Sequence, residues 1–268
     1  MTLPVDPIKW FSETLLLSGV AHTGPESHGK PEFVGKRVGL LNGSSWTIPW
    51  ANYFGRLFIP GAHLIKVGNE ALQINFMEAH EKGLPTPPQS NIDAFVKYAK
   101  DLVELGHVDA ILITCSTMNR SFPAVADAIK PYGIPVIQID RPMMEIAVKH
   151  GGKTLVTATH GPTVASTQAL LQETALEFKS TIDFVGDKVE AAWHSLAKGD
   201  VVGHNDLLAR AINLRQQSEK IDSVVLAQLS MTIFLLSYPE PQKVFGIPVF
   251  SSGQCGFERV AETLKDME

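Results

Sequence analysis

The sequence predicts an α/β fold built from two similar halves, and three observations support this prediction. Eight short apolar segments have the character of buried strands, longer amphipathic segments lie between several of them, and stretches of the first half recur in the second. Helices that connect fully apolar strands imply right-handed crossovers, so each half is expected to contain a mostly parallel sheet. A chain of 268 residues, of which 44% are hydrophobic, can bury the core that such a fold requires.

The predicted strands are short apolar runs bounded by polar, glycine or proline residues. They cover residues 36–42, 62–67, 109–115, 134–139, 153–159, 181–186, 222–228 and 247–252. The clearest helix is SNIDAFVKYAKDLVELG (90–106), whose Ser-x-x-Asp start predicts Ser90 as the capping residue and whose pattern ends at Gly106.

Two blocks of the first half align without gaps on blocks of the second half, at the same offset. VDAILITCSTM (108–118) aligns on IDSVVLAQLSM (221–231), and IPVIQID (134–140) aligns on IPVFSSG (247–253). One match of this kind could come from generic strand composition. Two matches at one offset indicate that a single α/β unit is used twice.

A third match, of GKRVGLLNG (35–43) with GKTLVTATH (152–160), places the start of each unit. The repeat divides the chain into four parts: an N-terminal extension (1–35), a first α/β repeat (36–150), a second repeat (151–253) and a C-terminal helix (254–268) that is a candidate to pack on the first repeat. The extension lies outside the repeat, and we expect an arm that packs on a partner subunit or covers the cleft.

Composition and motifs argue against several classes of protein. The net charge of −5 and the lack of a lysine or arginine cluster argue against nucleic-acid binding. No apolar stretch is long enough to span a membrane, and the N-terminus lacks the order of a signal peptide. Two cysteines cannot form a disulfide framework, so a cytoplasmic location is expected. Zinc-ligand spacing and glycine-rich nucleotide motifs are absent from the sequence, so neither a metal nor a nucleotide cofactor is expected.

The repeat also predicts where the site lies. Ligands of parallel α/β sheets bind beyond the carboxyl ends of the strands. Two such ends that face each other about a pseudo-two-fold axis enclose a cleft, which is a common place for small-molecule sites. Cys115 and Gln228 occupy the same position in the two repeats, so we expect them to face each other across that cleft.

Cys115 is the leading candidate for chemistry. The apolar character of its strand stops there, and the polar residues Ser116, Thr117 and Asn119 follow at once. Backbone N–H groups at the start of the next helix are suited to bind a carboxylate and to lower the pKa of the thiol. The competing interpretation is an inert, buried thiol, which we favour instead for Cys255 because no repeat position puts that residue at a strand end.

The strand-end Cys-Ser-Thr (115–117), its repeat in the second half and the THGPT turn (159–163) resemble the aspartate/glutamate racemase superfamily. This superfamily includes glutamate, aspartate and hydantoin racemases, maleate isomerase and arylmalonate decarboxylase. The resemblance extends from about Lys36 to Arg259. It implies two α/β domains with the active site between them, no pyridoxal phosphate and no metal. It also implies one cysteine per half, each moving a proton on one face of the carbon beside a carboxylate; Cys115 matches the first.

The position of the second cysteine holds Gln228, which departs from the pattern. A glutamine amide cannot give up a proton near neutral pH, but it can donate hydrogen bonds to a carboxylate or an enediolate. Three alternatives remain open. His160, in the strand-end turn of the second half, is a candidate second acid/base; decarboxylation could generate an enediolate that one thiol protonates; or Cys115 could attack carbon covalently, with His160 as the base.

The repeat also suggests residues that bind the substrate carboxylate, because turns that precede helix N-termini suit anionic oxygens. They are Asn42, Ser44, Ser45, Ser116, Thr117, Thr159, Thr163, Gln228 and Ser230. Asn69 and Asp140 are interpreted as structural, and His194 and His204 as surface or core histidines.

The sequence thus predicts a cofactor-independent enzyme of racemase or isomerase type that uses Cys115 on a small organic or amino acid. A single-cysteine decarboxylase of a malonate-like acid is the first alternative. A thiol-dependent hydrolase or lyase and a non-catalytic acid-binding protein are the others. A homodimer is the base-rate expectation. Side-chain selectivity is assigned to loops such as 68–90, whose spacing does not identify the substrate.

Overall fold

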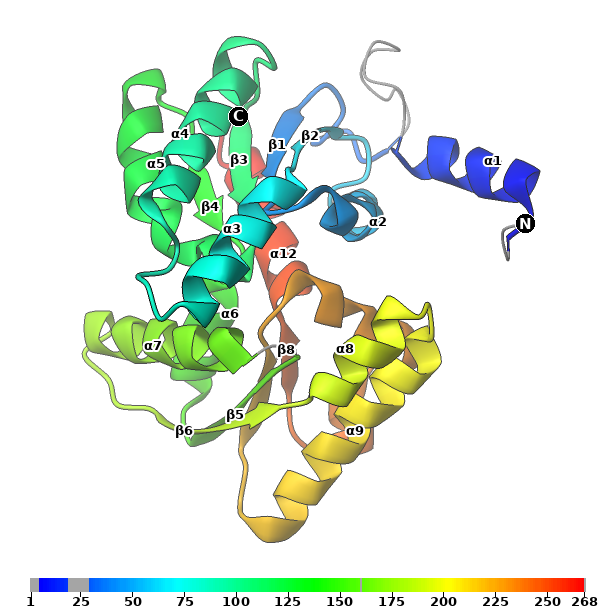
Figure 1. Cartoon of the computed structure of the whole chain (residues 1–268), viewed down its shortest axis with the longest axis vertical. Coiled ribbons are helices and arrows are strands. Elements are labelled where there is room, and N and C mark those ends of the chain that lie inside the picture. Colours follow the sequence, from blue (N-terminus) through cyan, green and yellow to red (C-terminus); the bar gives the residue numbers. More distant parts are fainter. Residues whose placement is uncertain (1–4, 19–28, 160, 268) are drawn as a thin grey trace.

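Each half of the chain forms a four-stranded parallel sheet in the computed structural model, which describes residues 5–18, 29–159 and 161–267 (Figure 1). The first sheet contains β1 (Arg37–Leu41), β2 (His63–Val67), β3 (Ala110–Ile113) and β4 (Val136–Gln138). The second contains β5 (Lys153–Ala158), β6 (Asp183–Lys188), β7 (Ser223–Leu226) and β8 (Val249–Ser251). All eight predicted strands are present, and the predicted fold of two parallel α/β halves is confirmed.

The two sheets have the same strand order, β2-β1-β3-β4 and β6-β5-β7-β8. In each sheet the chain leaves the first strand toward one edge and returns on its other side, so the order reverses between β1 and β3 and between β5 and β7. Leu41 pairs with Ile113 and Thr157 pairs with Leu226 at these points. Crevices at the carboxyl ends of strands where the order reverses are the usual ligand sites of such sheets.

Helices follow most of the strands. In the first half they are α2 (Ile48–Phe58), α3 (Glu70–Glu81), α4 (Gln89–Glu104), α5 (Phe122–Ile129) and α6 (Arg141–His150), with the 3-10 turns η2 (Ser45–Thr47), η3 (Ser116–Ser121) and η4 (Lys130–Tyr132). In the second half they are α7 (Gly161–Glu177), α8 (Glu190–Ala197), α9 (Val201–Ser218), α10 (Phe234–Ser237), α11 (Pro241–Phe245) and α12 (Ser252–Lys265), with the 3-10 turn η5 (Leu229–Ile233).

Two local predictions in the first half are wrong. The helix α4 begins at Gln89, and Pro88 rather than Ser90 is its N-cap. The Pro88 carbonyl accepts the first hydrogen bonds of the helix, from the N–H groups of Asn91 and Ile92 at 2.9 and 3.2 Å, and no side chain caps this helix start. The segment 68–90, expected as a loop, is largely the helix α3, which Asn69 caps by accepting a hydrogen bond from the Ala71 N–H at 2.9 Å.

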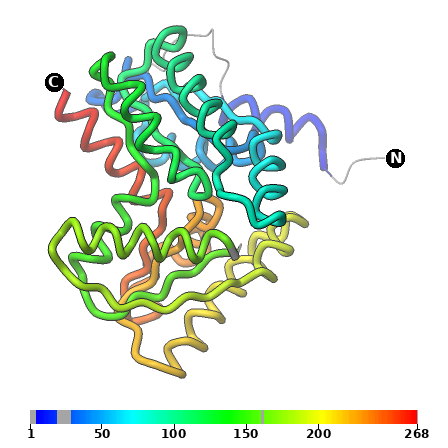
Figure 2. Tube along the Cα trace, turned by 60° about the vertical axis from the view of Figure 1, so that its left-hand side comes forward, coloured from blue at the N-terminus to red at the C-terminus, as the bar shows by residue number. Residues whose placement is uncertain are grey.

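The two halves exchange their last helices. The helix α6 follows β4 of the first sheet, yet its Met143 and Met144 pack against Val156 and Val225 of the second sheet. The helix α12 follows β8 of the second sheet and packs on the first half, where its red ribbon lies in Figures 1 and 2. Parallel sheets need cover on both faces, so each half completes its core with a helix that continues from the other half's sheet. This exchange fixes the two sheets relative to each other.

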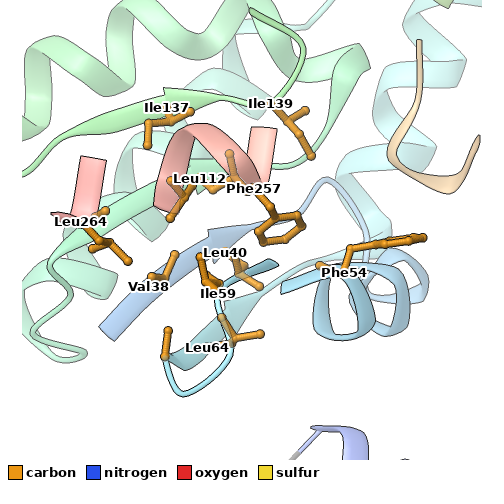
Figure 3. Packing of buried hydrophobic residues seen from close by; sticks show 14 of the residues in the cluster. Val38, Leu40, Phe54, Ile59, Leu64, Leu112, Ile137, Ile139, Phe257 and Leu264 are labelled. Atoms are coloured by element: carbon orange, nitrogen blue, oxygen red, sulfur yellow. The ribbon is translucent and has the colours of Figure 1, made fainter. Parts of the chain in front are cut away.

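The side chains of α12 show how this exchange is held. Phe257 and Leu264 point toward Val38 and Leu40 of β1 and toward Leu64 of β2 (Figure 3). Phe257 and Leu264 are fully buried, and burying each such side chain contributes about 1.5–3 kcal/mol relative to leaving it in water. The last helix is therefore part of the core of the first half.

The N-terminal helix α1 (Pro7–Ser18) extends away from both sheets and does not cover the strand ends (Figure 1). Its C-terminal end is held on the first half by cations, which suits the exposed carbonyls of a helix end. The Arg56 guanidinium donates to the Leu17 carbonyl, and Lys66 Nζ lies 2.7 Å from the Ser18 carbonyl. Within the described residues, no helix is both long and apolar enough to cross a bilayer.

Candidate active site

Cys115 lies two residues beyond β3, at the N-cap position of η3, where the backbone is still extended. Gln228 lies two residues beyond β7, at the N-cap position of η5, with a similar backbone conformation. Both residues line one cavity of about 60 Å³ between the halves. The expectation that the two equivalent positions meet at the carboxyl ends of the sheets agrees with this geometry.

The described side chains that line this cavity, which we call the thiol cavity, share one property: none of them is charged. They are Ser44, Trp46, Thr47, Gln73, Thr114, Cys115, Ser116, Thr117, Gln228, Leu229 and Ser230. A carboxylate in the thiol cavity would therefore be held by hydroxyl, amide and backbone donors. Such neutral donors are strong partners for an anion in a site from which bulk water is excluded.

The Gln228 amide is oriented by Thr159. Its Oε1 accepts hydrogen bonds from the Thr159 N–H at 2.7 Å and from the Thr159 hydroxyl at 2.9 Å. These two donors identify the oxygen end of the amide. The Nε2 group is consequently the end that can donate to a ligand in the thiol cavity. Thr159, proposed as a direct ligand contact, acts in the structure by holding Gln228.

The Cys115 thiol is half-buried, and its Sγ lies 3.1 Å from the Thr117 hydroxyl. Burial raises the pKa of this thiol above its ordinary value, and the Asp140 carboxylate raises it further. The Thr117 hydroxyl and the N–H groups of Met118 and Thr117 oppose that rise. The expectation of a lowered thiol pKa is therefore wrong, because desolvation outweighs the turn's donors.

An aromatic contact joins the halves beside the thiol cavity. Trp46, which lines the cavity from η2, packs edge-on against Trp193 of α8 with ring centroids 5.3 Å apart. Trp46 also contacts Trp50 of α2 in the same manner, at 5.4 Å. Edge-to-face ring pairs add about 0.5–1.5 kcal/mol beyond the area that they bury. The Trp46–Trp193 pair thus stabilises the packing of the two halves against each other.

A larger cavity of about 850 Å³ adjoins the thiol cavity and shares Ser116 and Thr117 with it. Its walls come from α3, η3 and α5 on one side and from α6 and α7 on the other. Two ion pairs lie along it, Arg120 with Glu173 at 3.5 Å and Arg141 with Glu177 at 2.6 Å. The thiol cavity has room for only a few water molecules, so the larger cavity is the space available for the rest of a ligand.

Several proposed ligand residues lie elsewhere. Asn42 is buried and is used within the fold: its Nδ2 donates to the Leu40 and Val67 carbonyls, each at 3.1 Å, and its Oδ1 accepts from Thr114 at 2.6 Å. The Ser45 hydroxyl donates to Glu70. His160, the proposed second acid/base, lies outside the described residues.

Thr163 is buried in α7, and its hydroxyl has no partner among the described residues. It does not line the thiol cavity. Among the described residues, no group of three His, Cys, Asp or Glu side chains is arranged to hold a metal ion.

The remaining candidates do not line the thiol cavity. Cys255 is buried in α12 against the α6 methionines, and burial raises the pKa of its thiol to about 12. His204 is fully buried, and its Nδ1 lies 2.9 Å from the Ala192 carbonyl, whereas His194 is exposed. Asp140 is fully buried and accepts hydrogen bonds from Ser116, at 3.1 Å, and from Asn119.

Sequence reasoning missed several cavity residues, and one pattern could have revealed Gln73 among them. EALQ (70–73) at the start of α3 corresponds to EAAW (190–193) at the start of α8, each after the second strand of its half. Gln73 lines the thiol cavity, and Trp193 contacts the indole of Trp46 that does so. The two helix starts therefore bring equivalent positions to the cleft from opposite sides.

Comparison with solved structures identifies the fold. The structure matches glutamate racemase from Francisella tularensis subsp. tularensis SCHU S4, solved with D-glutamate, with a TM-score of 0.62 and 16% identity over 87% of this chain and 82% of that one. It matches an aspartate racemase homologue from Pyrococcus horikoshii OT3 with a TM-score of 0.60 and 19% identity over 85% and 99% of the two chains. The chain has the fold of the Asp/Glu racemase superfamily.

An arylmalonate decarboxylase has the same fold, with a TM-score of 0.54 and 15% identity over 86% of this chain and 92% of that one. No protein-family model and no curated protein matches the sequence. At these identities the shared property is the fold. The reaction must be argued from the residues of the cleft.

Proposed function

We propose that this chain is a cofactor-independent enzyme of the Asp/Glu racemase superfamily in which Cys115 moves a proton at the carbon beside the carboxylate of a small acid. One observation carries the proposal: the Cys115 thiol and the Gln228 amide line the same uncharged cavity, at equivalent strand ends of the two halves. The fold shared with racemases and a decarboxylase supports it.

The chemistry assigns a role to each group. A carbon acid beside a carboxylate becomes an enediolate when it loses its proton, and the new charge lies on the carboxylate oxygens. We assign donation to those oxygens to the Ser44 and Ser230 hydroxyls and to the Gln228 Nε2 group, because all three side chains line the thiol cavity. The Cys115 thiolate removes the proton, and the thiol returns it. A racemase or isomerase reaction is the primary form of the proposal.

Gln228 favours a second candidate, decarboxylation of a malonate-like acid. Loss of carbon dioxide generates the same enediolate without a base, so a single thiol is sufficient to protonate it. Inversion of a centre needs an acid on the opposite face, and the Gln228 amide cannot supply one near neutral pH. Cys255 cannot act as the second thiol because it is buried in α12 away from the thiol cavity.

The test is incubation of the purified protein in D2O with a panel of amino acids, 2-hydroxy acids and malonates, followed by NMR. Deuterium that enters the α-carbon without loss of carbon supports racemisation or isomerisation, and release of carbon dioxide supports decarboxylation. The absence of turnover across the panel, together with ligand-induced shifts, would identify an acid-binding protein and overturn the proposal.

The two cysteines provide the matched control. Cys115→Ala is expected to abolish turnover, and Cys255→Ala is expected to leave it largely intact, because only Cys115 lines the thiol cavity. Inactivation by Cys255→Ala, in a protein whose circular dichroism is unchanged, would show that the working thiol has been misassigned. Gln228→Cys restores a thiol opposite Cys115, and gained racemisation would support the facing geometry.

A further inference from the structure

Asp140 is a buried carboxyl group directly behind the thiol cavity. It follows β4 and is fully buried. Its Oδ1 accepts a hydrogen bond at 3.1 Å from Ser116, the neighbour of Cys115 in the chain, and its Oδ2 accepts one from Asn119 of the same turn. Ser116 in turn lines both the thiol cavity and the larger cavity. The turn that carries the thiol is thus anchored on this carboxyl group.

No cation in the described part of the chain neutralises Asp140. The arginines on the elements around it are engaged elsewhere: Arg120 of η3 with Glu173, and Arg141 of α6 with Glu145 and Glu177. Arg259 of α12 is engaged with Glu145 and Glu262. The groups that lower the pKa of Asp140 are neutral, and burial prevails to raise it to about 6. A carboxyl group in this situation exists in both charge states near neutral pH.

Cys115 has no other charged neighbour of consequence among the described residues. The first half presents Ser44, Gln73 and Thr117 to the thiol cavity, and the second half presents Gln228 and Ser230, all of them neutral. In the part of the chain that the structure describes, Asp140 is the ionisable group whose charge acts on the pKa of the thiol, and it acts to raise that pKa. Two negative charges on these groups would repel each other in a poorly solvated site.

We propose that Asp140 is a positioning residue that sets the charge state of Cys115, so that the two groups carry a single negative charge between them. In the step that activates the thiol, Asp140 takes a proton from solvent and loses its charge, the S–H bond of Cys115 breaks with its proton passing to solvent, and the thiolate carries the negative charge instead of the carboxylate. The reverse step restores the thiol, and the total charge of the site does not change.

The second half lacks the equivalent network. At the repeat offset, Asp140 corresponds to Gly253 and Ser116 corresponds to Leu229. The space at Gly253 is closed, because a Cβ there would lie 3.0 Å from both Leu229 Cδ1 and Thr232 Cβ. The carboxyl group thus accompanies the half that carries the thiol, as expected if its purpose is to control that thiol.

The test is the pH dependence of Cys115 alkylation by iodoacetamide, a neutral reagent, followed by peptide-resolved mass spectrometry on the full chain. Asp140→Asn removes the charge and keeps the shape. Asn119 can turn its amide to match, since its buried Oδ1 has no partner among the described residues. Alkylation of Cys115 near neutral pH should be at least about threefold faster in Asp140→Asn, because more of the thiol is ionised.

Glu145→Gln is the matched control. It removes a carboxylate from α6 that is engaged with Arg141 and Arg259 and does not act on the pKa of the thiol. The pH dependence of Cys115 alkylation should therefore be the same as in the wild type. Asp140→Ser is a second charge-removing variant for the case in which Asp140→Asn does not fold. The proposal would be overturned if, in a folded Asp140 variant, the pH dependence of Cys115 alkylation is unchanged or shifts to higher pH. The inference rests on the proposed role of Cys115, but alkylation requires no turnover, so the two can fail separately.

Discussion

The backbone at Gly43 packs directly on the thiol of Cys115. A Cβ built on Gly43 would lie 3.1 Å from Cys115 Cβ and closer still to Cys115 Sγ. The turn after β1 can therefore pack this closely on the thiol only because residue 43 has no side chain. Gly43→Ala should displace the thiol and lower kcat/KM by about 100-fold, the order expected for a misplacement of about 1 Å. The stability loss should stay near 1–3 kcal/mol, as for other overpacked sites.

Gly39→Ala is the control for this variant. Gly39 lies on β1 itself, and a Cβ there would meet Leu102 Cδ1 at 3.1 Å, a side-chain atom that can move. Turnover and the alkylation rate of Cys115 are the measurements. Equal losses in both variants would show that Gly43→Ala acts through β1 as a whole and not through the thiol.

The Thr159–Gln228 contact predicts how the second half binds a carboxylate. Gln228→Glu keeps an oxygen for the two Thr159 donors, but replaces the Nε2 donor with a charged oxygen. A carboxylate ligand should bind at least about tenfold more weakly, because a donor is lost and a like charge is added. Thr159→Val, which removes only the supporting hydroxyl, should have a smaller effect. Calorimetry or KM with the substrate found in the NMR panel measures both, and unchanged affinity in Gln228→Glu would contradict this role.

The Trp46–Trp193 pair predicts how access to Cys115 is controlled. Trp193→Ala removes the ring contact between the halves, so bulky maleimides should reach Cys115 several-fold faster relative to iodoacetamide. Trp193→Phe should keep most of the contact, because an edge-to-face arrangement remains possible. Trp10→Ala, on the exposed helix α1, serves as the control and should leave the ratio of the two rates unchanged. A ratio that is equal in Trp193→Ala and the wild type would show that the pair does not restrict access.

The strand pattern was sufficient to predict the fold because fully buried parallel strands are almost uniformly apolar. Ile111 and Leu112 of β3 and Val224 and Val225 of β7 are all fully buried. The gapless alignment of these two strands also predicted that Cys115 and Gln228 would share one cavity. The start of α4 was missed because its N-cap residue, Pro88, has no side-chain acceptor, and this leaves no capping signal in the sequence.

The site was only partly predictable, because its electrostatics depend on burial that no local pattern records. Residues that follow β3, such as Thr117, were found because position along the strand implies position in the cleft. Gln73 comes from α3, whose segment had been interpreted as a loop. Asp140 was interpreted as structural because its sequence neighbours, Arg141 and Pro142, suggested pairing or capping. In the fold, Arg141 instead forms ion pairs with Glu145 and Glu177. The carboxyl group of Asp140 accepts hydrogen bonds from Ser116 and Asn119.

Asp140 also predicts how stability depends on pH. Burial raises the pKa of Asp140 in the folded chain from its ordinary value of 3.8 to about 6. The folded state therefore holds this proton more tightly than the unfolded state. The contribution of neutral Asp140 is fully present below about pH 4 and is lost as the pH rises through about 6, at a total cost of up to about 3 kcal/mol. Asp140→Asn, which cannot ionise, should thus be more stable than the wild type at pH values above about 6, and this gain should shrink steadily toward about pH 4. Urea unfolding of both proteins across this range measures the difference. A gain that does not change with pH would show that the folded state does not raise the pKa of Asp140, so that its carboxyl group is already fully ionised well below neutral pH and shares no charge with the thiol.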